Sequence, residues 1–319
     1  MGLPVSLAAV RAAARGLEGI AVRTPIVDLP TLTDRLGVPV GVKCEQLQPI
    51  GAFKIRGAYT AISRIAREGQ ARGIVTASSG NHGQAVAYSA RLFGLRAVVV
   101  MPASTPQIKV DGVCRYGGEV IFAGAVRSAE QAARAEEIGR EEDLIMVPPY
   151  DHVDVVTGQA TVGLEILEQR PEVDTILSPV SGGGLLAGIS VAVAALKPSV
   201  RLVGVEPEGA AKLTAALAAG EPRTLERTAS IADGLLTPSV GGFTWPILRR
   251  VVREAVRVSE AEIGEAVRFL HQEADLRVEP SGAVTTAALL SGRLRPAGPT
   301  VAVVSGGNVD PDLFQRLAG

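Results

Sequence analysis

The sequence predicts an α/β fold with mostly parallel sheets. Two features support this prediction: its hydrophobic pattern and the positions of its glycines. Short apolar runs rich in β-branched residues alternate with longer Ala-rich stretches of helical spacing along almost the whole chain of 319 residues. Clusters of glycine directly follow three of the apolar runs. This alternation is typical of βαβ units, in which helices connect parallel strands.

Six apolar runs are expected to form buried parallel strands. They are Gly73–Ala77, Arg96–Met101, Glu119–Phe122, Thr175–Leu177, Leu202–Val205 and Thr300–Val304. Helical spacing lies between them, for example at Ala85–Leu92 and Leu185–Leu196. A loop dense in Pro and Gly covers Gly234–Gly242, and such a loop in a compact domain is often functional.

The composition narrows the function classes. Hydrophobic residues make up 47% and charged residues 20%, with a formal net charge of −1, as in an ordinary globular protein. We find no basic run, so neither nucleic acid nor a polybasic membrane contact is expected. No apolar run approaches the length of about 18 residues that marks a membrane span, and no signal peptide is apparent, which favours a cytoplasmic protein. Two cysteines and three histidines give no metal-ligand spacing, so no metal is expected.

Lysine is scarce, and this focuses attention on one residue. Only five of the 32 basic Lys and Arg residues are lysines: Lys43, Lys54, Lys109, Lys197 and Lys212. A buried lysine can lose its proton and attack a carbonyl, whereas arginine stays protonated. Lys54 stands among apolar neighbours in QPIGAFKIRGAY, which favours a poised nucleophile over an ordinary lysine at an exposed helix start. Lys109 has the context of a helix surface.

The glycine clusters predict a ligand site. They are SSGNHG at 78–83, SGGG at 181–184 and SGGN at 305–308. Ligands of open α/β sheets bind outside the carboxyl ends of strands, so the three loops are expected to border one site. SGGG opens a helix, and its backbone N–H groups can cradle a phosphate. The alternative for SGGG alone is a tight turn without a ligand.

These motifs match a known family. The chain resembles the fold-type II pyridoxal-phosphate enzymes, within them the threonine dehydratase and serine racemase group. Four motifs carry the resemblance in the family's order: FKIRGA around Lys54, SSGNHGQA from Ser78, SGGGLLAG from Ser181 and SGGNVD from Ser305. The resemblance implies a two-domain α/β fold like that of the tryptophan synthase β subunit, with mostly parallel sheets. The small domain is expected at residues 48–143, and the large domain at 1–47 plus 144–319.

The resemblance also implies roles for matching residues. Pyridoxal 5'-phosphate would be held by Lys54 as a Schiff base, with Phe53 against its ring, Asn81 at its ring hydroxyl and Ser305 at its pyridine nitrogen. The phosphate would be bound by backbone N–H groups of Gly182, Gly183, Gly184 and Leu185. The substrate carboxylate would be bound by the loop of Ser78, Ser79, Gly80, Asn81 and His82. Ser79 is a second catalytic candidate, because a serine here protonates the opposite face of the substrate in racemases.

The expected activity is dehydration of a small β-hydroxy amino acid, L-threonine or L-serine, to a 2-oxo acid and ammonia. A serine at the pyridine nitrogen leaves the ring neutral, which favours elimination over a long-lived carbanion. The alternatives are an amino-acid racemase, a 3-hydroxyaspartate dehydratase or a catalytically silent cofactor-binding protein. Family members are commonly homodimers. Isoleucine control through a C-terminal regulatory domain is not expected, because the chain ends soon after SGGNVD.

One departure from the family concerns its divalent-metal site. Glu206 and Ala210 match two ligand positions of that site, but Lys212 stands where an Asp is expected. An ammonium repels a metal cation. Our hypothesis is that Lys212 pairs with Glu206 and substitutes for the metal; the alternative is an ordinary lysine on a helix surface.

Overall fold

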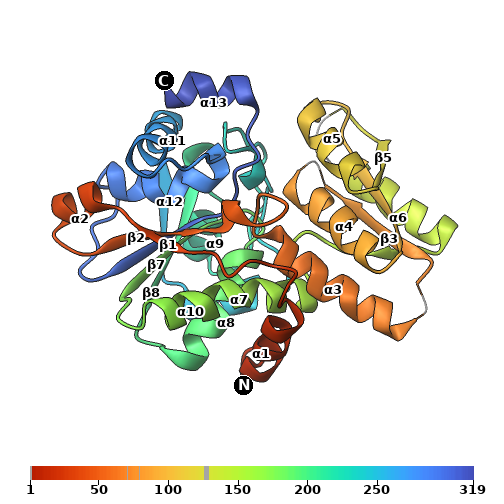
Figure 1. Cartoon of the computed structure of the whole chain (residues 1–319), viewed down its shortest axis with the longest axis horizontal. Helices are drawn as coiled ribbons and strands as arrows, with labels where there is room; N and C mark the ends of the chain where they lie inside the picture. Colours follow the sequence, from red (N-terminus) through yellow and green to blue (C-terminus); the bar gives the residue numbers. More distant parts are fainter. Residues whose placement is uncertain (1, 70, 79, 126–128) are drawn as a thin grey trace.

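The computed structural model describes residues 2–69, 71–78, 80–125 and 129–319 and contains two β-sheets with helices packed on them (Figure 1). Both sheets are mostly or wholly parallel, which confirms the predicted α/β fold. All six expected strands are present, two of them longer by a few residues.

The larger sheet has six strands in the order β1-β2-β10-β7-β8-β9. Among its described strand pairs, only the edge pair β1–β2 is antiparallel. Its central strands are buried on both faces, as continuous apolar runs predict. The strands are β1 (Ile26–Asp28), β2 (Val40–Cys44), β7 (Thr175–Pro179), β8 (Arg201–Pro207), β9 (Glu254–Val258) and β10 (Thr300–Val304).

The smaller sheet has four parallel strands in the order β5-β4-β3-β6 and forms the right-hand part of Figure 1. They are β3 (Gly73–Ala77), β4 (Arg96–Met101), β5 (Glu119–Phe122) and β6 (Ile145–Met146). Its helices are α3 (Lys54–Glu68), α4 (Asn81–Leu92), α5 (Gln107–Arg115) and α6 (Ala129–Glu142). We propose that the two sheets are the cores of the two expected domains. β6 lies just beyond the expected boundary at residue 143.

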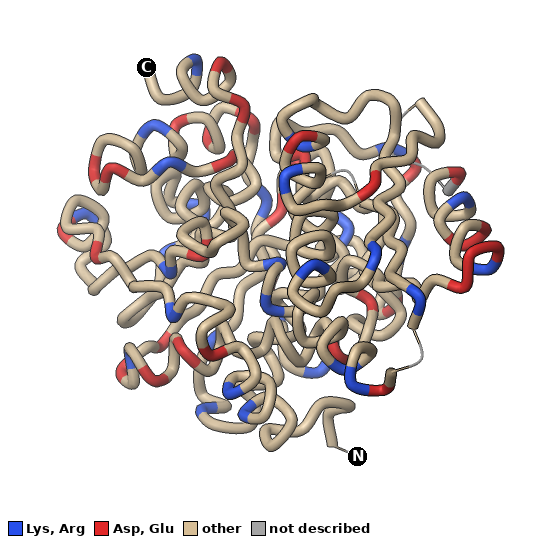
Figure 2. Tube along the Cα trace, turned by 45° about the vertical axis from the view of Figure 1, so that its right-hand side comes forward, with Lys and Arg blue, Asp and Glu red and all other residues tan. Residues whose placement is uncertain are grey.

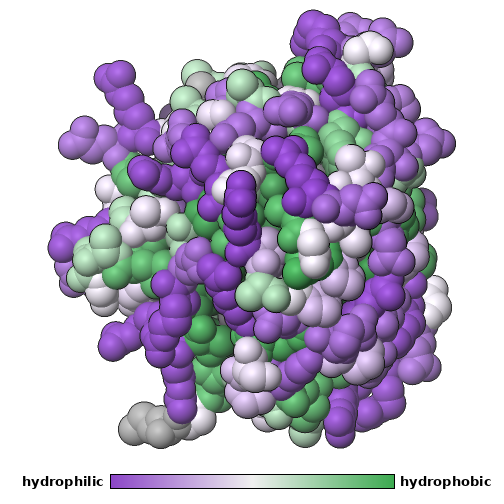
Figure 3. Space-filling view, turned by 90° about the vertical axis from the view of Figure 1, so that its left-hand side faces the viewer, coloured by the Kyte–Doolittle hydropathy of each residue, from purple (hydrophilic) through white to green (hydrophobic). Residues whose placement is uncertain are grey.

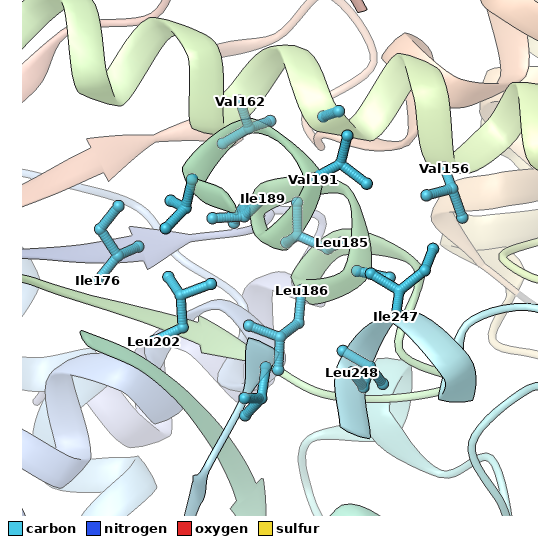
Figure 4. Close-up of a cluster of buried hydrophobic side chains, with 14 of the residues drawn as sticks. Val156, Val162, Ile176, Leu185, Leu186, Ile189, Val191, Leu202, Ile247 and Leu248 are labelled. Carbon is cyan, nitrogen blue, oxygen red and sulfur yellow. The ribbon is translucent and has the colours of Figure 1, made fainter. Parts of the chain in front are cut away.

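The remaining helices belong to the larger sheet and its loops. They are α1 (Leu7–Gly16), α2 (Pro30–Leu36), α7 (Val153–Gln169), α8 (Gly184–Leu196), α9 (Lys212–Ala219), α10 (Trp245–Val251), α11 (Glu260–Ala274), α12 (Pro280–Leu290) and α13 (Pro311–Ala318), with short 3-10 turns η1 (Glu45–Leu47), η2 (Glu208–Ala210) and η3 (Asp233–Leu235). Every residue of α8 from Gly184 to Val193 is buried. Figure 4 shows Leu185, Leu186 and Ile189 of α8 among side chains of α7, α10, β7 and β8. Burial of each such side chain contributes roughly 1.5–3 kcal/mol to the free energy of folding. The well-packed helix α8 therefore gives the glycine loop before it a rigid support.

A buried ionic cluster ties α3 to the larger sheet. Arg56, 1% exposed, donates from Nε and Nη2 to the carboxylate of Glu45 at 2.8 Å and from Nη1 to Glu165 at 2.6 Å. Lys43 donates to the other oxygen of Glu165 at 2.5 Å. Burial opposes the charge of Glu45, but the attraction of Arg56 outweighs it and lowers the pKa of that carboxyl. The cluster fixes the helix whose first residue is Lys54.

The surface carries charges of both signs, interspersed along the trace rather than gathered by sign (Figure 2). One face shows hydrophilic side chains over most of its area, with small apolar patches between them (Figure 3). Within the described ranges, no helix has the length and apolarity to cross a bilayer. In the same residues, no group of three or more His, Cys, Asp or Glu side chains is arranged to hold a metal ion.

Candidate active site

The glycine loops after β7 and β10 and the segment before Lys54 lie together. β7 and β10 are neighbouring parallel strands, so their carboxyl ends meet at one edge. The chain ahead of α3 is then hydrogen-bonded to the loop after β10: Phe53 N–H donates to Ser305 O at 3.1 Å, and Gly307 N–H donates to Gly51 O at 2.9 Å. The order of elements thus brings Lys54 to this edge of the six-stranded sheet.

Lys54 is half-buried at the start of α3. Its Nζ donates to Pro149 O at 2.7 Å and lies 5.2 Å from the ring centroid of Phe53. The lysine amine therefore faces the segment that follows β6, directly before Tyr150.

The other four lysines have hydrogen-bond or ion-pair partners of their own. Lys43 pairs with Glu165, and Lys197 donates to two backbone carbonyls. Lys109 forms an ion pair with Asp233 and is only 8% exposed, so its expected place on a helix surface is wrong. Lys212 lies 3.7 Å from Glu206 with no exposed surface, so the expected pairing is present and the alternative of an ordinary surface lysine is excluded.

The loop Gly182–Gly184 forms a cradle that only glycine permits. Gly183 has φ +93°, a left-handed conformation that costs little for glycine alone. A Cβ on Gly182 would lie 2.3 Å from the Tyr150 ring, and one on Gly184 would lie 2.8 Å from Tyr150 Cβ. Gly183 precedes α8 and has no side chain that could cap the helix, so the first N–H groups of α8 and the helix dipole can bind an anion. Leu185 follows in the first turn of α8 and is buried.

The loop after β3 begins α4. The hydroxyl of Ser78 accepts from the N–H groups of Gly80 at 3.3 Å and Gly83 at 3.1 Å, so it holds the first turn of the helix. Asn81 is the first residue of α4, and its Nδ2 donates to Glu279 at 2.7 Å. Ser79, our second catalytic candidate, lies outside the described residues.

His82 is buried and neutral. Its Nε2 lies 3.0 Å from Val147 O, which as a pure acceptor requires the proton on Nε2. Burial, together with the nearby charge of Lys54, lowers the pKa of His82 to about 3. These contacts fit a residue that shapes the loop rather than a proton shuttle.

Comparison with known proteins identifies the chain's family. The family model described as "Pyridoxal-phosphate dependent enzyme" matches residues 17–306. The chain belongs to this family. Because the match reaches from the end of α1 to the loop after β10, it includes Lys54 and spans the three glycine clusters up to Gly306.

Individual relatives are similar over most of their length. A serine racemase of Arabidopsis thaliana is 41% identical over 295 residues, 90% of this chain and 88% of its own. An L-threonine ammonia-lyase of Geobacter sulfurreducens is 43% identical over 290 residues, 90% of this chain and 72% of its own. An L-threo-3-hydroxyaspartate ammonia-lyase of a Pseudomonas species is 38% identical over 96% of both chains. The solved structure of maize serine racemase superposes with a TM-score of 0.94 at 36% identity, covering 98% of this chain and 96% of that one.

The residues of this pyridoxal-phosphate dependent enzyme fit its cofactor. Tyr150 packs directly on Gly182 and Gly184, which requires glycine at both positions. The loop has no side chains, so its backbone N–H groups and the α8 N-terminus can bind a phosphate. Lys54 can supply the amine for a covalent link. Ser305 is 4% exposed and its hydroxyl lies 3.4 Å from Ser281 O, where it can also meet a ring nitrogen. We propose the roles of Phe53, Lys54, Asn81, Gly182–Leu185 and Ser305 on this basis.

Two contacts near the site are not indicated by any sequence motif. Asp151 accepts the N–H groups of Gly242, Phe243 and Thr244 at 2.8–3.1 Å, which ties the Pro- and Gly-dense loop to the segment beside Lys54. The pairing of Lys109 with Asp233 joins α5 of the smaller sheet to η3 of the larger. Both contacts join residues roughly 90 or more positions apart, so a local pattern could not have found them.

Proposed function

We propose that the chain is a pyridoxal-phosphate dependent ammonia-lyase that dehydrates L-threonine, L-serine or both to a 2-oxo acid and ammonia. The observation that carries the proposal is the position of Lys54: its Nζ binds Pro149 O at 2.7 Å, and the next residue, Tyr150, packs on the cradle at Gly182. A nucleophilic amine beside an anion cradle is the arrangement that this chemistry needs. The similarity to an L-threonine ammonia-lyase supports the choice of reaction.

The mechanism assigns a task to each part of the site. Bound pyridoxal phosphate supplies an electron sink that weakens the Cα–H bond of an amino acid joined to it. Lys54 Nζ would hold the cofactor and, as a free amine, would accept the Cα proton of the substrate. Backbone N–H groups of the loop from Ser78 to His82 bind and orient the substrate carboxylate. The hydroxyl of Ser305 would meet the ring nitrogen without charging it, which would favour departure of the β-hydroxyl.

Two alternatives, racemisation and an acidic substrate, each have a specific observation in their support. The serine racemase of Arabidopsis thaliana is about as similar as the ammonia-lyase, which favours racemisation as a second activity, with Ser79 as the proposed acid. Lys109 Nζ lies 3.8 Å from the place of a Cβ on Gly80, so a cation borders the substrate loop. A cation there is compatible with an acidic side chain such as that of 3-hydroxyaspartate, the substrate named for the Pseudomonas relative. A homodimer in the cytoplasm is part of the proposal.

The test is a substrate panel on the purified holoenzyme. L-threonine, L-serine and L-threo-3-hydroxyaspartate are each incubated with the enzyme, and the 2-oxo acid, ammonia and both enantiomers of the remaining amino acid are quantified. We expect 2-oxobutyrate or pyruvate in equal amounts with ammonia. Enantiomer formation without 2-oxo acid would replace the dehydratase by a racemase. No turnover of any of the three would favour the silent binding protein. Light scattering after gel filtration tests the dimer.

A further inference from the structure

Glu279 is a buried carboxyl in the site that the proposed mechanism does not use. It precedes α12 and is 3% exposed. Burial raises its pKa to about 7, and the groups that act on it are Lys109, Asp233, Asn81 and Lys54. A buried carboxyl lowers the stability of the folded protein unless it is hydrogen-bonded or paired with a charge. The hydrogen bonds of Glu279 therefore indicate its role.

Glu279 ends a chain of hydrogen bonds that runs through two asparagine side chains. Asn308 Nδ2 donates to Asn81 Oδ1 at 2.8 Å and also to Ile50 O at 2.8 Å. Asn81 Nδ2 then donates to Glu279 Oε1 at 2.7 Å. Ile50 O can only accept, which fixes the Asn308 amide with its Nδ2 toward Ile50 and Asn81. Asn81 must then accept through Oδ1, so its Nδ2 faces Glu279. The chain has a fixed direction from Asn308 to Glu279.

Two glycines make the space for this chain. A Cβ on Gly306 would lie 2.3 Å from Glu279 Oε1 and 3.0 Å from Asn81 Nδ2. A Cβ on Gly51 would lie 2.4 Å from Asn308 Oδ1. A side chain at either position would push the hydrogen-bonded groups apart. Glycine is therefore needed around the site for these hydrogen bonds as well as for the Gly182–Gly184 loop.

The direction of the chain leaves one specific group of Asn81 for a ligand. Asn81 Oδ1 already accepts from Asn308, and one of the two Nδ2 hydrogens is given to Glu279. The second hydrogen is the donor that can bind the ring hydroxyl of the cofactor. We propose that Glu279 and Asn308 are positioning residues that hold the Asn81 amide with this N–H directed to the cofactor. The proposal rests on the cofactor of the family, not on which amino acid is dehydrated.

The hydrogen bonds from Asn308 through Asn81 to Glu279 also connect the two sheets. Asn81 begins a helix of the four-stranded sheet, whereas Glu279 and Asn308 follow elements of the six-stranded sheet. The orientation of Asn81 therefore depends on residues from the other side of the site. If the two sheets moved apart, the Asn81 amide would lose its hydrogen-bond partners. The contact between Asn81 and the ring hydroxyl of the cofactor therefore depends on how closely the two sheets approach each other.

The experiment compares variants of the holoenzyme by equilibrium dialysis with pyridoxal 5'-phosphate and by the visible absorption band of the bound cofactor. Glu279→Ala removes the acceptor, and Asn308→Asp replaces the donor by an acceptor. We expect the dissociation constant to rise about three- to tenfold in both, with a shifted band, as for the loss of one hydrogen bond. Glu279→Gln keeps an acceptor oxygen and is expected within about twofold of wild type, with an unshifted band. Glu265→Gln, at an exposed position of α11, is the matched control.

Two results would overturn the proposal. One is wild-type affinity and band position in Glu279→Ala and Asn308→Asp. The other is an equal loss in Glu279→Gln and Glu279→Ala, which would mean that charge matters and hydrogen-bond direction does not. Thermal melts establish that each variant is folded. Asn308→Ala, which removes the donor without adding charge, takes the place of Asn308→Asp if that variant does not fold. All of these readouts are independent of dehydratase activity.

Discussion

The Nζ atom of Lys212 lies 3.7 Å from Oε1 of Glu206, and neither side chain has exposed surface. The same Nζ donates to Ala210 O and Leu235 O at 2.7 Å each. A carboxylate and two carbonyls are ligands that a hard cation also takes. The ammonium thus stands among groups suited to a metal, as the hypothesis of substitution requires. Burial raises the pKa of Glu206, and Lys212 opposes that effect.

We predict that activity and melting temperature do not respond to a chelator or to added Mg²⁺ or Ca²⁺, because Lys212 already supplies the positive charge. Lys212→Ala leaves Glu206 buried without that charge and is expected to cost about 3–5 kcal/mol of unfolding free energy. Denaturant unfolding measures the loss. Stabilisation by Ca²⁺ in Lys212→Asp but not in wild type would support substitution for a metal. Stabilisation of the wild type itself would contradict it.

Arg56 is predicted to be essential to stability. Arg56→Ala leaves Glu45 with no exposed surface and without its main cation, so we expect a loss of about 3–5 kcal/mol. Arg64→Ala on the same helix removes ion pairs with Glu68 and Asp154 in which Arg64 is 58% exposed, and it is expected to cost under about 1 kcal/mol. Urea unfolding of both variants measures the difference. Equal losses would show that the buried cluster does not hold α3.

The cradle is predicted to reject a side chain at Gly183. Gly183→Ala combines φ +93° with a contact of 2.7 Å to Leu248 Cδ1, so we expect weaker retention of pyridoxal 5'-phosphate on dialysis. Gly220→Ala has a similar φ of +74° but nothing within 4 Å, which separates backbone strain from crowding. Gly220→Ala should lose only about 1 kcal/mol of stability and keep its cofactor. Equal cofactor retention in the two variants would argue against the phosphate role.

His82 is predicted to make the folded protein sensitive to acid. Its pKa is about 3 in the folded protein, against an ordinary value of 6.5, so between these values the unfolded chain binds the extra proton. The contribution to stability is complete above pH 6.5 and falls as the pH drops toward 3, by up to roughly 5 kcal/mol. His82→Gln should flatten this part of the stability curve, whereas His271→Gln, which is 41% exposed at its side chain, should leave it unchanged. An unaltered slope in His82→Gln would refute the assignment.

Much of the fold could be predicted from sequence because its strands are continuous apolar runs. β4 and β5 have the predicted bounds. β9 was not predicted: Glu254–Val258 is an edge strand in which Glu254 and Arg257 interrupt the apolar residues, so it resembles a surface segment. β6 has only two residues, too few for any periodicity. β2 was missed as well, although all of its residues are buried, because Gly41 and Lys43 interrupt its apolar run.

The site was predictable where glycine loops and a rare lysine coincided. The pairing of Lys212 with Glu206, six positions apart, was predicted from the family's metal site. The environment of Lys109 was not, since its partner Asp233 lies 124 positions away, across the site. Asn308 was part of a recognised motif, but its contact with Asn81 depends on how the two sheets meet. Such long-range pairings need coordinates, because a one-dimensional pattern does not encode them.

The most direct test of the central claim is the visible absorption spectrum of the purified protein, recorded with and without L-threonine or L-serine, beside a 2-oxo acid assay on the same sample. We predict a visible band of lysine-bound pyridoxal phosphate in wild type and in Lys43→Arg. We predict loss of this band in Lys54→Ala, and formation of 2-oxobutyrate or pyruvate by the wild type but not by Lys54→Ala. A wild-type protein that stays colourless after incubation with pyridoxal 5'-phosphate, or a Lys54→Ala variant that keeps the band, would contradict the claim.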